Sequence, residues 1–88
     1  MDKLLITILT PKETLFKDWA RYIQLPGRDG YFGVLPNHSP LFAALKKGKI
    51  KIKKENQELQ IESYDGFASI CDNKIIVLID GYASITNQ

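Results

Sequence analysis

Cysteine is nearly absent from this sequence, since Cys71 is the only one among 88 residues. One cysteine cannot form an internal disulfide, and a cysteine-based metal cluster would need several more ligands. Long apolar runs are missing too: the longest, Leu41–Leu45 and Ile75–Ile79, have five residues each, whereas a helix needs about 20 to span a bilayer. We therefore expect no membrane-spanning helix, and a reducing compartment fits the cysteine content best.

Neither sign of charge dominates, because 12 Lys and Arg residues stand against 10 Asp and Glu, which leaves a net charge of +2. That excess is too small to imply a polyanionic partner by itself. The basic residues are unevenly placed, however, and six of the nine residues from Lys46 to Lys54 are lysines.

Export is not expected, since Met1–Leu4 leads into strand-like sequence without the basic and apolar segments of a signal peptide.

What the sequence does contain is typical of one small globular domain. Hydrophobic residues make up 44% and charged residues 25% of the chain, a balance that argues against general disorder and fibrous repeats. A chain of 88 residues has room for a single core. We therefore expect residues 1–88 to form one domain.

Short alternating segments separated by turn residues predict β-strands along most of the chain. Leu4–Leu9 and Ala20–Leu25 are expected as two early strands. Lys49–Lys53 alternates strictly between lysine and isoleucine, and Leu59–Ser63 alternates again. Because successive strand side chains point to opposite faces, these two segments predict a hairpin that is apolar on one face and pairs lysines with glutamates on the other.

The second half of the chain predicts another hairpin. Gly66–Ile70 and Lys74–Ile79 flank residues 71–73, where Asp and Asn suit a tight turn because both tolerate positive φ. Ile75–Ile79 is apolar on both faces, so we expect it in the middle of the structure, covered on both sides. Tyr82–Ile85 is expected to add a short final strand.

No segment predicts a stable amphipathic helix. Leu41–Lys46 could form one helical turn, but Pro40 before it and Gly48 after it leave little room, so an extended segment is expected. Many short strands with frequent turns predict an all-β fold, an antiparallel β-sandwich or flattened barrel of about eight to ten strands.

The most informative stretch is rich in turn residues. Pro26–Gly30 predicts a chain reversal, and Pro36 and Pro40 bracket a second restricted loop. The run Gly30-Tyr31-Phe32-Gly33-Val34-Leu35-Pro36-Asn37-His38-Ser39-Pro40-Leu41 is similar to the Gly-x-x-Gly-apolar-[Leu/aromatic]-Pro-x-His-Ala-Pro-Leu signature of the epsilon subunits of rotary F-type ATP synthases.

Two later blocks carry the same resemblance. Asp65–Ile70 resembles the family's Gly-Gly-Phe-x-x-Val, and Asn73–Asp80 resembles its Asn-x-Val-Thr-Val-Leu-Ala-Asp. The residues that match the family signature are Gly33, Leu35, Pro36, His38, Pro40, Leu41, Gly48, Gly66 and Phe67. Asp65 departs from the pattern where the family has glycine, and Tyr31 stands where some relatives carry an acidic residue.

The resemblance implies a subunit of the central stalk rather than an enzyme, with no catalytic residue, metal or cofactor. Such a subunit binds the gamma subunit and the c-ring, reaches the alpha/beta hexamer indirectly, and couples proton translocation to ATP synthesis. It would lie at the cytoplasmic face of a bacterial inner membrane, or the organellar equivalent, and touch the membrane only through the complex. Because the sequence ends at Gln88, we expect the family's inhibitory, ATP-binding C-terminal helical domain to be absent.

The family's docking surfaces carry over to particular residues. The c-ring docking loop matches Asp29, Gly30, Tyr31, Phe32 and Gly33, and the gamma interface matches His38, Leu41, Phe42 and Ala43. Phe32, Leu35, Leu41 and Phe42 are the candidate apolar anchors, and ordinary core packing is the alternative for each.

Two other kinds of function are alternatives to a subunit of the central stalk. A small barrel could bind single-stranded nucleic acid along the lysine strand, but Ile50 and Ile52, rather than aromatic residues, separate the lysines. His38 beside Ser39 does not predict a catalytic pair, because adjacent residues on an extended chain point to opposite faces. Asp29, Asp65, Asp72 and Asp80 are expected at turns or strand ends as local hydrogen-bonding residues.

Overall fold

The computed structural model describes residues 2–87, and every regular element in that range is a β-strand. The strands are β1 (Leu4–Leu9), β2 (Thr14–Ala20), β3 (Tyr22–Gly27), β4 (Gly30–Val34), β5 (Leu41–Leu45), β6 (Gly48–Lys53), β7 (Glu58–Ser63), β8 (Gly66–Cys71), β9 (Lys74–Ile79) and β10 (Tyr82–Asn87). Residues 2–87 contain no helix long and apolar enough to cross a membrane.

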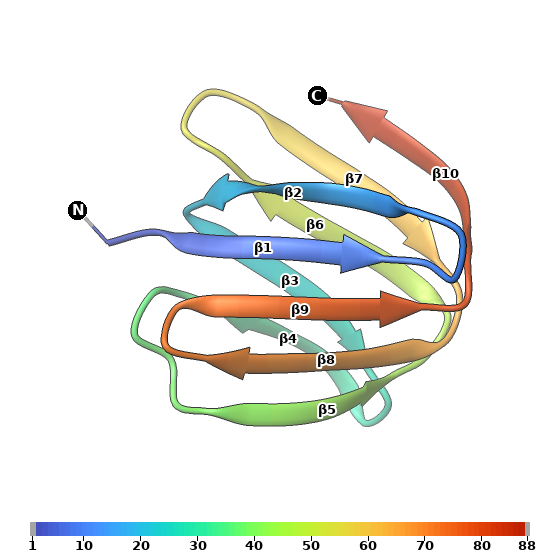
Figure 1. Cartoon of the computed structure of the whole chain (residues 1–88), viewed down its shortest axis with the longest axis horizontal. Helices are drawn as coiled ribbons and strands as arrows, with labels where there is room; N and C mark the ends of the chain where they lie inside the picture. The colour runs from blue at the N-terminus through green and yellow to red at the C-terminus, as the bar shows by residue number, and fades with distance from the viewer. Residues whose placement is uncertain (1, 88) are drawn as a thin grey trace.

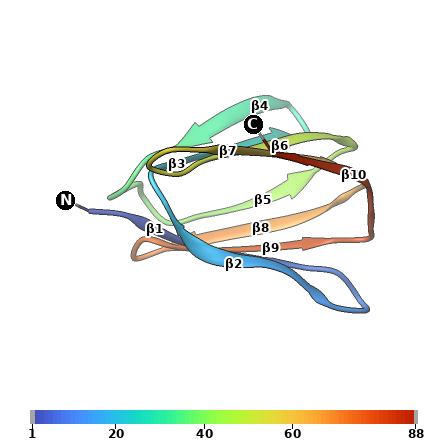
Figure 2. The ribbon, with the colours of Figure 1, turned by 90° about the horizontal axis from the view of Figure 1, so that it is seen from above.

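The strands pack as two layers, which lie face to face in Figures 1 and 2. The first layer has the order β5-β8-β9-β1-β2, and the second has the order β4-β3-β6-β7-β10. The layers join at one corner, where the Arg28 N–H donates to the Ala44 carbonyl at 3.0 Å and the Lys46 N–H to the Pro26 carbonyl at 2.9 Å. This arrangement confirms the predicted all-β sandwich.

Strand pairing is antiparallel at every described ladder except one. β1 and β9 run parallel, with Ile6 opposite Ile75 and Ile8 opposite Val77. This pairing brings together two strands from opposite ends of the chain, and it closes the centre of the first layer (Figure 1). A parallel pair was not foreseen, because local alternation carries no information about which distant strand becomes a neighbour.

The core lies between the layers and is built by alternation. Inward side chains of β1, β3, β6, β8 and β9 are almost fully buried, while their neighbours in sequence face outward. The buried apolar residues are Leu4, Ile6, Ile8, Ala20, Ile23, Leu25, Val34, Leu45, Ile50, Ile52, Ile61, Ala68, Ile70, Ile75, Val77 and Ile79. Branched aliphatic residues dominate, as expected on a pleated surface packed on one side.

Most strands lie where alternation predicted them. β1 has the predicted bounds, the hairpins β6–β7 and β8–β9 form, and Asp72 and Asn73 take positive φ values of 51° and 62° in the turn between β8 and β9. Leu41–Leu45 is a strand, and the final strand, β10, extends to Asn87.

The strand predicted over Ala20–Leu25 exists as β3, but its bounds were displaced by two residues, since β3 spans Tyr22–Gly27 and Ala20 is the last residue of β2. Strand β2 was missed entirely. Its pairing with β1 shifts at Leu15, since Ile8 faces Phe16 while Leu9 faces Thr14. A β-bulge of this kind breaks the alternation by one residue, so both Leu15 and Phe16 pack against the core.

The five turns at one end of the sandwich gather side by side, at the right of Figure 1. We call this the turn end, and it comprises residues 10–13, 28–29, 46–47, 64–65 and 80–81. Backbone hydrogen bonds join two of these turns directly, from the Tyr64 N–H to the Gly81 carbonyl at 3.0 Å and from the Asp80 N–H to the Asp65 carbonyl at 2.9 Å. The loop of residues 35–40 lies at the opposite end (Figure 1).

Candidate docking surfaces

The outside of the first layer is apolar. Ile76 on β9 lies in register with Ser69 on β8 and Thr7 on β1, and Ser69 is opposite Phe42 on β5. In the next row, Ala44, Phe67 and Leu78 lie side by side. The large hydrophobic side chains of this surface, which we call the outer apolar face, are Trp19, Phe42, Phe67, Ile76 and Leu78, and they are 47% to 70% exposed.

This exposure corrects one expectation from the sequence. Ile75–Ile79 was expected to be covered on both sides, but only Ile75, Val77 and Ile79 are buried, while Ile76 and Leu78 are about half exposed. The reason is that residues 2–87 form only two layers, so within the described structure the outer side of β9 has no third layer over it. Contiguous exposed apolar surface of this kind is typical of interaction sites.

The outside of the second layer is polar instead. Lys49, Lys51 and Lys53 on β6 lie opposite Glu62, Gln60 and Glu58 on β7. The isoleucines between these lysines, Ile50 and Ile52, are fully buried. Alternating charges that face each other across a hairpin form a solvated surface. The geometry therefore gives the nucleic-acid alternative no support.

Phe42 belongs to the outer apolar face. The other residues assigned to the gamma interface do not all lie on the same side of β5 as Phe42. Phe42 is 70% exposed, the highest value among the large apolar side chains of residues 2–87. Leu41 and Ala43 precede and follow it on β5, so they point toward the inner side, and Leu41 pairs with Ile70. His38 lies in the loop before β5, where its Nδ1 is 2.7 Å from the Ser39 carbonyl oxygen.

The loop that carries His38 is fixed by its neighbours. The Asn37 N–H donates to Asn73 Oδ1 at 2.5 Å, and the Asn37 side chain donates to Asp2 Oδ2 at 2.8 Å. Asn73 Nδ2 donates in return to Asn37 Oδ1 at 3.2 Å. Asn37 takes a φ of 70°, a conformation that asparagine tolerates. This network fixes the loop of residues 35–40, which lies at the end of the sandwich opposite the turn end (Figure 1).

The residues assigned to c-ring docking do not form one surface. Asp29 and Gly30 are exposed at the turn end, and Gly30 has a φ of 138°, which side chains rarely adopt. Phe32 is partly buried and packs against the core, so core packing accounts for it. The Tyr22 ring covers Gly33.

Tyr31 is half exposed and lies across the second layer. Its hydroxyl oxygen accepts a hydrogen bond from the Lys49 backbone N–H at 2.9 Å. The absence of a side chain at Gly48 makes this possible, since a Cβ there would stand 2.7 Å from the Tyr31 hydroxyl. The ring is thus held against β6 instead of extending from the turn end.

The charged side chains that pair in this structure lie at the edge of the sandwich. The Lys54 ammonium donates to Asp18 Oδ2 at 2.5 Å, and this bond joins an edge strand of the first layer to the end of β6 in the second. Together with the Trp19 N–H, Lys54 holds the pKa of the Asp18 carboxyl below its usual value. Within residues 2–87, no three His, Cys, Asp or Glu side chains are grouped to hold a metal ion.

Sequence reasoning found Phe42 but missed most of the outer apolar face. Trp19, Ile76 and Leu78 were not named as site residues, and Phe67 was named only as part of the signature. The available signal was the run Ile75–Ile79, because a strand that is apolar on both sides needs two covering layers. An 88-residue chain folded as a two-layer sandwich covers only one of them.

The fold and the outer apolar face define a β-sandwich module with one exposed apolar sheet face. A family model described as "ATP synthase, Delta/Epsilon chain, beta-sandwich domain" matches residues 3–84. The chain belongs to this family.

Similar sequences agree with the family. The chain is 43% identical over 82 residues to an ATP synthase epsilon chain of Campylobacter curvus, covering 92% of this chain and 64% of that protein. It is 40% identical to the epsilon chain of Campylobacter concisus, covering 100% and 69%, and 39% identical to that of Leptospira interrogans, covering 90% and 62%. The chain thus spans roughly two thirds of the length of these relatives, 62% to 69%.

Two solved structures share the fold. A chain of the mitochondrial ATP synthase of Euglena gracilis (OSCP/F1/c-ring) superimposes with a TM-score of 0.86 at 19% identity, covering 92% of this chain and 52% of that one. A chain of the central stalk/c-ring of the Tetrahymena thermophila enzyme gives a TM-score of 0.72 at 14% identity, covering 97% and 66%. At these identities the likeness establishes the fold alone.

Proposed function

We propose that this protein is a non-catalytic subunit of the central stalk of an F-type ATP synthase, which binds the gamma subunit and the c-ring and turns with them. The observation that carries the proposal is the outer apolar face, a sheet face that the chain itself leaves uncovered. Family membership supplies the identity of the complex, since its similar relatives are named ATP synthase epsilon chains.

The outer apolar face is the surface we assign to gamma. Phe42 lies at one end of it and stacks on Phe67, so the assignment widens from residues 38–43 to the outward side chains of β5, β8 and β9. A stable interface buries about 1,600 Å² with aromatic anchors near its centre. Two exposed phenylalanines in contact meet that description.

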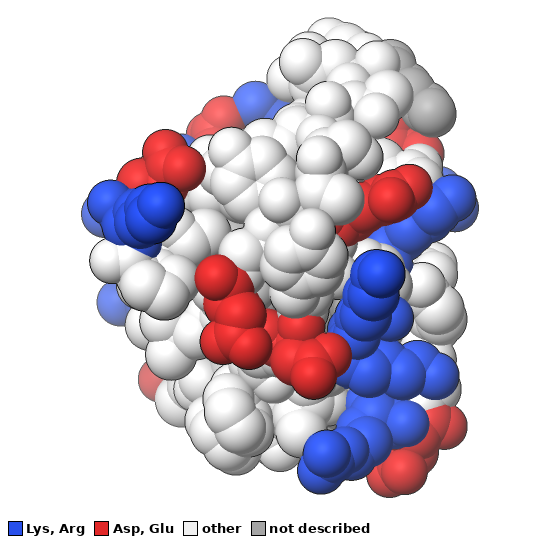
Figure 3. Space-filling model, turned by 90° about the vertical axis from the view of Figure 1, so that its right-hand side faces the viewer, with Lys and Arg blue, Asp and Glu red and all other residues white. Residues whose placement is uncertain are grey.

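Within the turn end, the Asp29–Gly30 turn is the part we assign to the c-ring. Asp29 and Gly30 lie there, beside four other turns of the sandwich. Figure 3 looks at this end and shows acidic side chains near its middle and basic side chains along one side. Hydrogen-bonded ladders behind these turns resist deformation, which suits a part that transmits rotation.

In this proposal the protein is a peripheral component that reaches the membrane only through the complex, on the cytoplasmic face in a bacterium. It contributes no reacting group. Its role is to couple ion translocation through the c-ring to ATP synthesis in the alpha/beta hexamer.

Reconstitution tests this role. Adding the purified chain to an ATP synthase complex depleted of its epsilon subunit should restore ATP-driven proton pumping in vesicles. If the chain binds the depleted complex but pumping stays uncoupled, the coupling role is wrong. A gel shift with single-stranded oligonucleotides tests the other class of function, and salt-sensitive binding there without binding to the complex would replace the rotor proposal.

A further inference from the structure

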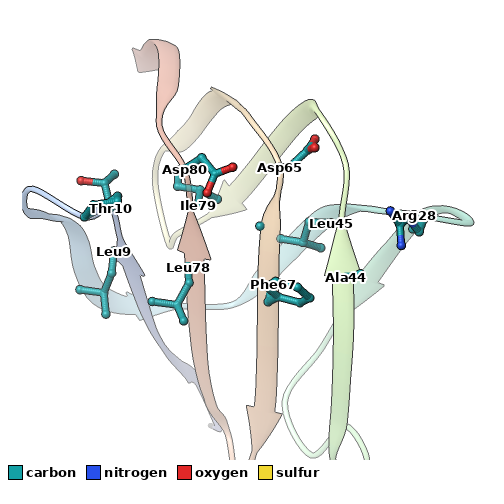
Figure 4. A pocket seen from close by; sticks show the side chains of 12 residues that line it. Leu9, Thr10, Arg28, Ala44, Leu45, Asp65, Phe67, Leu78, Ile79 and Asp80 are labelled. Atoms are coloured by element: carbon teal, nitrogen blue, oxygen red, sulfur yellow. The ribbon is translucent and has the colours of Figure 1, made fainter.

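The outer apolar face ends in a groove at the turn end (Figure 4). The groove has a volume of about 400 Å³ and is lined by turns and strand ends from across the first layer. Its floor is apolar and includes Leu9, Phe67 and Leu78, which come from three neighbouring strands. The floor is continuous with the outer apolar face, because Phe67 and Leu78 belong to both.

Two carboxylates stand at the rim of this groove. Asp65 and Asp80 lie just beyond the paired ends of β8 and β9, where the Asp80 N–H donates to the Asp65 carbonyl at 2.9 Å. Alternation puts them on the same side of the sheet as Phe67 and Leu78. Both lie within the lining of the groove, and Figure 4 shows them beside its floor.

These two carboxylates lack a cationic partner within the described chain. The salt bridges of residues 2–87 are Lys3–Glu55 and Lys54–Asp18, so neither Asp65 nor Asp80 takes part in one. Arg28 lines the groove on its other side without closing such a pair. The groove therefore carries two acidic side chains that form no salt bridge with the described residues, and a cation from outside is their complementary partner.

We propose that this groove binds a segment of the gamma subunit that presents a lysine or arginine beside an apolar side chain. The apolar side chain would cover Phe67 and Leu78, and the cation would lie between Asp65 and Asp80. The inference rests on the proposed function and adds to it the chemistry of the partner segment. Asp65 matters most, since it stands where the family signature has glycine.

Continuity of the floor favours gamma over the c-ring as the source of the segment. The groove opens onto the outer apolar face that we assign to gamma, whereas the Asp29–Gly30 turn belongs to the second layer. A bare metal ion fits less well, because residues 2–87 offer no third acidic, histidine or cysteine ligand grouped with this pair.

Binding of the 88-residue chain to a gamma-containing complex that lacks epsilon, measured at low and high salt, tests the inference. The double variant D65N/D80N should bind about tenfold more weakly than the unaltered chain at low salt, and the difference should shrink as salt screens the pair. Because both aspartates are exposed, the thermal unfolding midpoint of this variant should be unchanged. D72N is the matched control, since Asp72 is an exposed aspartate at the opposite end of the sandwich and asparagine tolerates its φ of 51°.

Each outcome separates the two claims. If the unaltered chain does not bind the gamma-containing complex, the proposed function fails. If it binds and F42S weakens binding, but D65N/D80N keeps the same affinity and salt dependence, only the groove inference is wrong. If D65N/D80N impairs capture of the c-ring and leaves gamma binding intact, the assignment of the segment to gamma is wrong.

Discussion

The rings of Phe42 and Phe67 stack across β5 and β8, with centroids 5.6 Å apart and planes inclined by 15°. Both rings lie outside the sandwich, where they add nothing to the buried core. Because the two rings are already stacked on each other, they lose little further side-chain entropy when a partner binds them. This preordered aromatic pair is the most specific feature of the outer apolar face.

Replacing Phe42 with serine should weaken binding to the gamma-containing complex without unfolding the domain. Truncating an aromatic anchor of an interface costs about 2 kcal/mol or more, which corresponds to about a 30-fold rise in Kd. The free energy of unfolding should fall by less than about 1 kcal/mol, since the side chain is mostly exposed. Titration calorimetry and urea denaturation measure the two effects, and loss of the fold would indicate a core role for Phe42 instead.

Ile75 and Ile76 are neighbours of the same residue type on opposite sides of β9, which makes them a matched pair. Ile75→Ala should lower the free energy of unfolding by about 2–5 kcal/mol, because Ile75 is fully buried. Ile76→Ala should change stability by less than about 1 kcal/mol and weaken binding to the gamma-containing complex. Equal losses of stability in the two variants would contradict the assignment of inner and outer faces.

Gly66→Ala should destabilise the sandwich. A Cβ at this position would collide with the Leu78 carbonyl oxygen of the paired strand, and overpacking of this kind costs about 1–3 kcal/mol. Gly81→Ala is the control, since a Cβ there would meet only the Tyr64 ring, at 3.3 Å. Thermal unfolding of both variants measures the difference, and a larger loss from Gly81→Ala would count against the packing described here.

Acid should weaken the link between the layers at Asp18. The hydrogen bond from Lys54 lowers the pKa of Asp18 in the folded protein, so the ionised carboxylate contributes stability above its unfolded pKa of about 3.9. That contribution is lost as the pH falls through the lower, folded pKa. The difference in unfolding free energy between the unaltered chain and D18N should therefore be present at neutral pH and vanish in strong acid. A difference that stays constant across this range would show that the ion pair is not its cause.

Local sequence patterns predicted those strands and turns whose conformation depends on residues close together in the sequence. The lysine–isoleucine alternation of Lys49–Lys53 gave a strand with its buried face correctly identified, and Asp72-Asn73 gave the turn that positive φ requires. Strand β2 was not recognised from the sequence, because the extra residue in the bulge at Leu15 interrupts the alternation of apolar and polar residues. The pairing of β1 with β9 depends on contacts between distant segments, which no local pattern encodes.

The candidate site was predicted less completely than the fold. The resemblance named Phe42 together with Leu41 and Ala43, which alternation on β5 directs to the other side of the strand, although Leu41 is still 38% exposed. Phe32 was offered as an anchor and packs against the core. The acidic pair at the groove depends on the register of β8 and β9, which places Asp65 opposite Asp80. Sequence alone shows the two aspartates 15 residues apart.

Co-purification tests the central claim most directly. The chain, carrying an affinity tag, is expressed in its own organism and isolated from gently solubilised membranes, with the F42S variant alongside. The account predicts that gamma and the c-ring subunit are recovered with the unaltered chain, and that gamma is depleted with F42S. Recovery of neither subunit with a folded, unaltered chain would contradict the account.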